Sequence, residues 1–110
     1  MGSQSDRDYL ELILRAVEAI RRSAAGGRER FLASEDAYDA GLRRLHTIAE
    51  STQRLSMELK ERHPEIPWAQ IAGFRNRIVH AYMDVDPDLV WSVIETELPA
   101  LTQLAIGELH

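Results

Sequence analysis

Apolar side chains recur at intervals of three and four residues along most of the chain, which is the spacing of one helix face. The first such run covers residues 9–24 and is followed by Gly26 and Gly27, which favour the end of a helix. A second run begins near Ser34, a good N-cap residue, and ends near Arg62, before the two prolines of "HPEIP". Its inward positions are Tyr38, Leu42, Leu45, Ala49, Thr52, Leu55 and Leu59. These spacings predict two long amphipathic helices.

The second half of the chain carries two further helix starts. Pro67 suits the first turn of a helix that runs to about Tyr82. Asp86 suits an N-cap, with Pro87 in the first turn after it, and so begins a fourth helix. Pro99 is expected to kink or split that helix, which leaves "ALTQLAIGEL" as a short fifth segment.

The pattern as a whole predicts an all-α fold, a small up-and-down bundle of four to five helices. No run alternates convincingly with a period of two residues, so no sheet is expected. The length of 110 residues suits one domain over residues 1–110, with flexible ends at residues 1–6 and 108–110.

The net charge of −5 disfavours a protein that coats nucleic acid through its charge alone. The basic residues are almost all arginine, however, since Lys60 is the only lysine among the 13 lysine and arginine residues. Arginine favours planar recognition of phosphate, although a GC-rich genome also enriches it. The composition therefore leaves a local phosphate site open.

No apolar run approaches the roughly 20 residues that span a bilayer, and the start of the chain has no signal-peptide pattern. Cysteine is absent, which excludes disulfides and thiolate zinc sites. We therefore expect a cytoplasmic protein that has no membrane partner.

The stretch "FRNRIVHAYM", Phe74 to Met83, has two apolar sides. Three-and-four spacing directs one side toward the core of the chain, through Ile71, Phe74, Ile78 and Ala81. Asn76, Val79, His80 and Met83 lie on or near the opposite side. Because two apolar residues flank a histidine there, we expect a second copy of the chain to cover this face. That predicts a homodimer with His80 at or near the two-fold interface.

The polar residues of the same stretch suit phosphate chemistry. Arg75 can hold a phosphoryl oxygen, and His80 can take or give a proton near neutral pH. The two diverge by about 140° on an ideal helix, so they would meet in a cleft only across a dimer. Together with Asn76 they suit attack of a ribose 2′-hydroxyl on the neighbouring phosphate without a metal. The alternative is that they are solvated or interface residues with no catalytic role.

"RNRIVHAY" resembles the Arg-x4-His-x-Tyr signature of the HepT toxins, in the HEPN ribonuclease superfamily. "ERHPEIPWAQIAGFRNRIVHAYMDVD", "RRLHTIAES" and "DLVWSVIETELPAL" are similar to the corresponding blocks of that family, so the resemblance covers about residues 9–104. It implies an α-helical homodimer whose arginines and histidines from both subunits meet in an interface cleft. The implied activity is a metal-independent endoribonuclease, without a cofactor.

Carried over by position, the resemblance gives catalytic roles to Arg75, which would stabilise phosphate, and His80, which would handle the proton. Asn76 would be the polar residue that follows the arginine. Tyr82 would be the residue that a cognate MntA antitoxin, a minimal nucleotidyltransferase, modifies with AMP. The added phosphodiester charge beside Arg75 would occupy the position that an RNA phosphate needs.

One position departs from the family pattern. His46 stands where the family often has a glutamate, and we expect it to be a helix-face residue rather than a neighbour of the cleft. Glu50 matches the later glutamate of that segment and is expected to orient Arg75 through an ion pair. No metal site is expected, because the alternating aspartates of "DVDPD" form a capping cluster.

The sequence therefore predicts the toxin of a type VII-like toxin–antitoxin pair, an endoribonuclease that cleaves tRNA or mRNA and is neutralised by its nucleotidyltransferase partner. A non-catalytic dimeric helical module that binds such a partner is the alternative. A continuous positive cleft around Arg75 and Arg77 would favour the ribonuclease. An isolated arginine pair on an acidic surface would favour the binding module.

Overall fold

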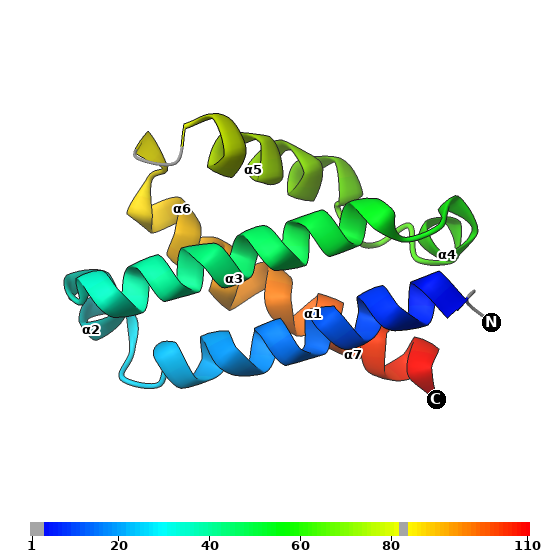
Figure 1. The fold of residues 1–110 in the computed structure, drawn as a ribbon, viewed down its shortest axis with the longest axis horizontal. Coiled ribbons are helices and arrows are strands. Elements are labelled where there is room, and N and C mark those ends of the chain that lie inside the picture. Colours follow the sequence, from blue (N-terminus) through cyan, green and yellow to red (C-terminus); the bar gives the residue numbers. More distant parts are fainter. Residues whose placement is uncertain (1–3, 82–83) are drawn as a thin grey trace.

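The computed structural model describes residues 4–81 and 84–110, which hold helices and no strand (Figure 1). The helices are α1 (Gln4–Ser23), α2 (Arg28–Ala33), α3 (Glu35–Arg54), α4 (Met57–Arg62), α5 (Trp68–His80), α6 (Pro87–Ser92), the π-helical η2 (Val93–Glu97) and α7 (Leu98–Leu109). None of these helices is both long enough and apolar enough to cross a bilayer. The predicted all-α class is confirmed.

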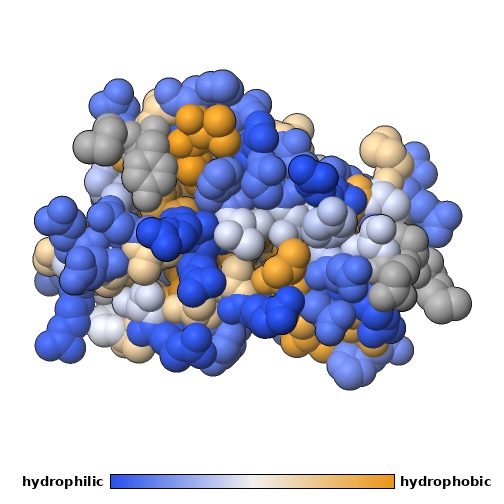
Figure 2. Space-filling model, in the orientation of Figure 1, coloured by the Kyte–Doolittle hydropathy of each residue, from blue (hydrophilic) through white to orange (hydrophobic). Residues whose placement is uncertain are grey.

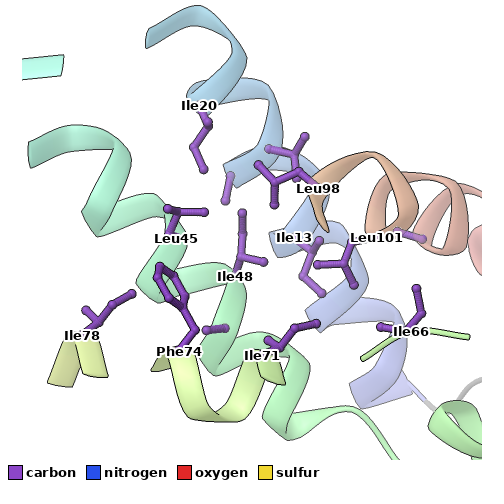
Figure 3. Packing of buried hydrophobic residues seen from close by; sticks show 14 of the residues in the cluster. Ile13, Ile20, Leu45, Ile48, Ile66, Ile71, Phe74, Ile78, Leu98 and Leu101 are labelled. Atoms are coloured by element: carbon purple, nitrogen blue, oxygen red, sulfur yellow. The ribbon is translucent and has the colours of Figure 1, made fainter. Parts of the chain in front are cut away.

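The long helices run alternately in opposite directions, with α3 between α1 and α5 and with α6 and α7 behind (Figure 1). Their apolar faces meet in one core, to which every long helix contributes (Figure 3). Its labelled members are Ile13, Ile20, Leu45, Ile48, Ile66, Ile71, Phe74, Ile78, Leu98 and Leu101. Removal of this apolar surface from water is the main driving force that holds the helices together.

Local sequence signals set several of the helix starts, as predicted. The Ser34 side chain accepts a hydrogen bond from the backbone N–H of Ala37 at 3.1 Å, which caps α3. The Asp86 carboxylate accepts from the N–H of Asp88 at 2.9 Å, which caps α6. These caps satisfy N–H groups that the first helical turn leaves without partners.

The helix α2 was not predicted, and a buried aromatic residue explains its presence. Gly27 begins it with a φ of 94°, a backbone conformation that favours glycine. Phe31 is 1% exposed and packs so closely on α3 that a Cβ at Gly41 would lie 2.6 Å from the ring. The Phe31 ring also packs against Trp91, with centroids 5.6 Å apart. This short helix therefore depends on contacts with distant parts of the chain.

The predicted helix from Ser34 to Arg62 is instead two helices, and α1 accounts for the break. Asp6 is 2% exposed, and its carboxylate accepts hydrogen bonds from the backbone N–H and the hydroxyl of Ser56, at 2.8 and 2.7 Å. The Ser56 hydroxyl in turn accepts from the N–H of Leu59 and caps α4. Because Asp6 and Ser56 are far apart in sequence, helical periodicity gave no sign of this break.

The first and last helices extend into the segments near the two ends of the chain. Gln4 to Asp6 form the start of α1, and Glu108 lies within α7. The Glu108 carboxylate accepts a hydrogen bond from Arg62 at 2.7 Å and lies 2.6 Å from Nε2 of His63. Asp6 and Glu108 are thus each bonded to residues in or next to α4, and the flexibility of the two ends stays a prediction.

Pro99 disturbs the last helix, as predicted. The disturbance is a wider, π-helical turn that precedes the proline. Proline has no N–H and crowds the carbonyl of the residue four positions earlier, which is Glu95. The structure has a π-helical turn over Val93–Glu97, where the N–H of Leu98 donates to the carbonyl of Val93. The chain therefore stays helical from Pro87 to Leu109.

Substitution of Asp6 by alanine should destabilise the fold by about 2 kcal/mol, because it leaves two partly buried donors of Ser56 without their charged acceptor. Urea unfolding followed by circular dichroism measures this loss in the free energy of unfolding. Asp8→Ala is the matched control, since Asp8 is exposed on the same helix and should change stability by less than about 0.5 kcal/mol. Equal midpoints for the two variants would show that Asp6 does not hold the α3–α4 break.

Candidate functional site

Arg75 on α5 and Glu50 on α3 form an ion pair, as expected from the sequence. Nε of Arg75 donates a hydrogen bond to Oε1 of Glu50, and Nη1 donates to Oδ1 of Asn76 at 3.1 Å. The side chains of Arg75 and Glu50 are 30% and 34% exposed. Among the described residues, Nη2 of Arg75 has no hydrogen-bond partner. The guanidinium is thus held through Nε and Nη1, and the N–H groups of Nη2 remain available to an anion.

The hydrogen bond from Arg75 is the main cause that lowers the pKa of Glu50, against a smaller opposing effect of burial. The charges of Arg75, His46 and Arg54 act in the same direction. A lowered pKa keeps Glu50 ionised throughout the neutral range, so the carboxylate that holds Arg75 is present there.

His46 is a neighbour of this site, contrary to expectation. Its Nε2 lies 4.0 Å from Oε1 of Glu50, one helical turn along α3. Both residues line a hollow of about 290 Å³ together with Tyr9 and Arg54. The position at which the sequence departs from the family pattern therefore faces the carboxylate that positions Arg75.

His80 is the last residue of α5 and is exposed, without a hydrogen bond to any described residue. Five positions separate it from Arg75, so the two side chains leave the helix on different faces. Val79 lies beside it and is 42% exposed. One chain therefore does not bring Arg75 and His80 together. Tyr82 and Met83 lie outside the described residues.

Arg75 also borders a hollow of about 530 Å³ between α1, α3 and α5. Its other lining residues are Ser5, Tyr9, Glu50, Gln53 and Arg54. Figure 2 shows a largely hydrophilic surface over these three helices, in the orientation of Figure 1. The surroundings of Arg75 are polar, which suits a charged and hydrated ligand better than an apolar one.

A different, mostly apolar cavity of about 440 Å³ lies on the other flank of α5, above α3 and beside α6, η2 and α7. Gly73, Phe74 and Arg77 contribute its α5 wall, and Glu97 lies on the far side. Arg75 does not line it. Within one chain, Arg75 and Arg77 therefore border separate cavities and do not form one continuous positive cleft.

The two tryptophans of the chain have structural roles. Trp68 and Trp91 pack against the core, and Nε1 of Trp68 donates to the carbonyl of His63 at 3.0 Å. Within residues 4–81 and 84–110, no group of three or more histidine, aspartate or glutamate side chains could hold a metal ion.

Comparison with known proteins shows the family of the chain. The profile of a family described as "Ribonuclease HepT-like" matches residues 13–106. The chain belongs to this family. A protein of Thermococcus cleftensis named "Probable ribonuclease HepT" is 34% identical over 89% of this chain and 90% of its own length. One from Caldanaerobacter subterraneus subsp. tengcongensis, named a "Putative RNase", is 33% identical over 89% of this chain and 88% of its own. No solved structure matches significantly.

The sequence named only some of the residues that line the hollow beside Arg75. Glu50 and Arg75 were among the candidates, whereas Tyr9, Gln53 and Arg54 were not. The spacing of His46, Glu50 and Arg54, four residues apart on one helix, was an available signal that these side chains share a face. Tyr9 lies far away in sequence, and only the packing of α1 on α3 places it there.

The substitution Arg75→Gln should raise the pKa of Glu50 toward its ordinary value, because it removes the hydrogen bond that lowers this pKa. Carboxyl NMR titration measures this pKa directly. Arg77→Gln removes the same charge from the opposite flank of α5 and should leave the pKa low. An unchanged pKa in the Arg75 variant would mean that the ion pair does not form in solution.

Proposed function

We propose that this chain is a metal-independent endoribonuclease that acts as a homodimer and serves as the toxin of a toxin–antitoxin pair. The proposal is carried by the arrangement of α5, where Arg75 is fixed by Glu50 of α3 and His80 is exposed on the same helix as Arg75. The chain also belongs to the ribonuclease HepT-like family. Cellular RNA, either tRNA or mRNA, is the proposed substrate.

The reaction that these side chains suit is transfer of the phosphodiester to the 2′-oxygen. The ribose 2′-oxygen forms a bond to phosphorus while the bond to the 5′-oxygen breaks, which yields a 2′,3′-cyclic phosphate and a 5′-hydroxyl. One proton leaves the 2′-hydroxyl and one is added to the departing 5′-oxygen, and His80 handles this proton transfer. Arg75 stabilises the charge that develops on the phosphoryl oxygens.

The orientation of the two residues supports a dimeric site. Because Arg75 and His80 leave α5 about 140° apart, a second copy is needed to enclose a phosphate between them. The partly exposed Val79 next to His80 supports an apolar contact at this place. A two-fold axis near α5 would bring an arginine and a histidine from both subunits into one cleft.

Regulation through Tyr82 completes the proposal. In the sequence Tyr82 follows His80 by two positions, at the end of the motif. A nucleotidyltransferase antitoxin would transfer AMP to its hydroxyl and add a negative phosphodiester and a nucleoside near the catalytic residues. The added charge would compete with RNA phosphate for Arg75.

The substitution His80→Ala should reduce cleavage of total RNA by about 10²–10⁴-fold, since it removes the group that transfers the proton. The assay contains a chelator, in which the wild type should stay active, and the 2′,3′-cyclic ends are identified by mass spectrometry. His110→Ala, in the exposed last residue, should cleave like the wild type. Analytical ultracentrifugation should find dimers in all three proteins.

Two results would contradict this assignment. Full activity of His80→Ala would exclude His80 as the catalytic residue, and a monomeric active wild type would exclude the shared site. Absence of cleavage by an unmodified wild-type dimer would instead favour the non-catalytic module that binds a nucleotidyltransferase.

Co-expression with a cognate nucleotidyltransferase should increase the intact mass of the wild type by one or more AMP groups and abolish its RNA cleavage. Tyr82→Phe keeps the ring without the hydroxyl, so it should gain no mass and remain active. Tyr9→Phe is the matched control and should be modified like the wild type. Mass gain in the Tyr82 variant would place the modification elsewhere.

A further inference from the structure

The groove between α1 and α3 extends from Arg75 to side chains that the proposed chemistry does not use, namely Tyr9, Gln53 and Arg54. The hollows of about 530 and 290 Å³ share Tyr9, Glu50 and Arg54, so they adjoin along this groove. The larger one reaches Arg75 on α5, and their volumes lie close to the range of pockets that take small ligands, about 300–1,000 Å³. A ligand bound at Arg75 could therefore extend along the groove.

The groove carries a positive charge within an acidic chain. Its charged lining residues are Arg54, Arg75 and Glu50, which gives two positive charges against one negative, or +1 with His46 neutral. The chain as a whole has a net charge of −5. Glu50 pairs with Arg75, and Arg54 is exposed and forms no ion pair within 4.0 Å among the described residues. Arg54 is thus the cation of the groove that is available to a second anion.

The other side chains of the groove suit a nucleotide. Tyr9 is half-buried, with contacts to the core, and also borders both hollows. A ring supported in this way offers a rigid stacking surface for a base. Gln53 is exposed beside it and has a carboxamide that can donate to and accept from a base edge.

We propose that this groove binds the RNA nucleotide next to the cleaved phosphate, with Arg54 on the neighbouring phosphate, Tyr9 stacked on the base and Gln53 at its edge. The proposal rests on the function proposed above and adds the path of the strand. The strand must be single in the groove, because a base inside a duplex cannot stack on a protein side chain. Loops and unpaired ends of RNA are therefore the preferred cleavage sites.

The test measures binding of a fluorescein-labelled single-stranded oligoribonucleotide of mixed sequence to the full-length His80→Ala protein, which prevents cleavage. Anisotropy titrations across a series of salt concentrations give the slope of log K against log salt. Arg54→Gln should reduce that slope by about 0.7, the contribution of one phosphate contact to a single strand. Arg21→Gln is the matched control, because Arg21 is exposed in the last turn of α1, about 18 Å from Tyr9 along the helix, and should leave the slope unchanged.

The stacking role has a separate readout. Tyr9→Leu should weaken binding about tenfold at each salt concentration without changing the slope, while Tyr9→Phe keeps the ring and should bind like the parent. Circular dichroism and urea unfolding verify that both variants fold. A duplex of the same sequence should bind more weakly than the single strand.

Several outcomes would overturn the proposal. If Arg54→Gln has the same slope as Arg21→Gln, or Tyr9→Leu binds as well as Tyr9→Phe, RNA does not follow this groove. Competition by free AMP at the same concentration as the oligonucleotide would show a mononucleotide site instead of a strand path. In each case cleavage of total RNA by the wild type shows that the ribonuclease assignment still stands. Absence of both cleavage and RNA binding would reject that assignment and the groove with it.

Discussion

The packing of α3 between α1 and α5 is the constraint on which the rest of the structure depends. A helix with neighbours on two sides and a core beneath it keeps only a narrow strip of its surface in water. On α3 this strip holds His46, Glu50 and Arg54, each one turn from the next. Because α1 and α5 stand on either side, polar residues of this strip lie at the bottom of a groove. The same packing that buries the core therefore creates the polar site.

The ion pair between Arg75 and Glu50 matters for position more than for stability. Both side chains are about one-third exposed, and ion pairs of this kind contribute roughly 0–1 kcal/mol to folding. A free arginine side chain, by contrast, samples many rotamers, and the pair restricts it to one direction before any ligand binds. An arginine oriented in advance loses less entropy when it binds an anion, so the pairing with Glu50 favours anion binding by Arg75.

Features that depend on neighbouring residues could be predicted from the sequence, and those that depend on distant ones could not. The caps at Ser34 and Asp86 and the disturbance at Pro99 arise within one or two helical turns. The helix α2 requires Phe31 to reach Gly41, and the break before α4 requires Asp6 to reach Ser56.

The candidate site divides in the same way. The motif residues Arg75 and His80 stand out in the sequence, and resemblance to a known family supplied the pairing of Glu50 with Arg75, which the structure confirms. The contribution of Tyr9 needed the packing of α1 on α3, and the orientation of His46 toward Glu50 needed the exact line of the strip on α3. A motif therefore gives candidate residues for the chemistry, while the side chains that surround them depend on the fold.

The acidic net charge does not argue against a local site for RNA, because salt limits how far a charge acts. At physiological ionic strength the screening length is about 8 Å, and the chain measures 41 × 26 × 21 Å. Carboxylates that lie farther than this length from the groove therefore do little to cancel the charge of Arg54 and Arg75. They do reduce attraction of RNA to the rest of the surface, where nonspecific binding depends on total positive charge. An acidic protein with one positive groove would bind RNA where cleavage takes place and release it elsewhere.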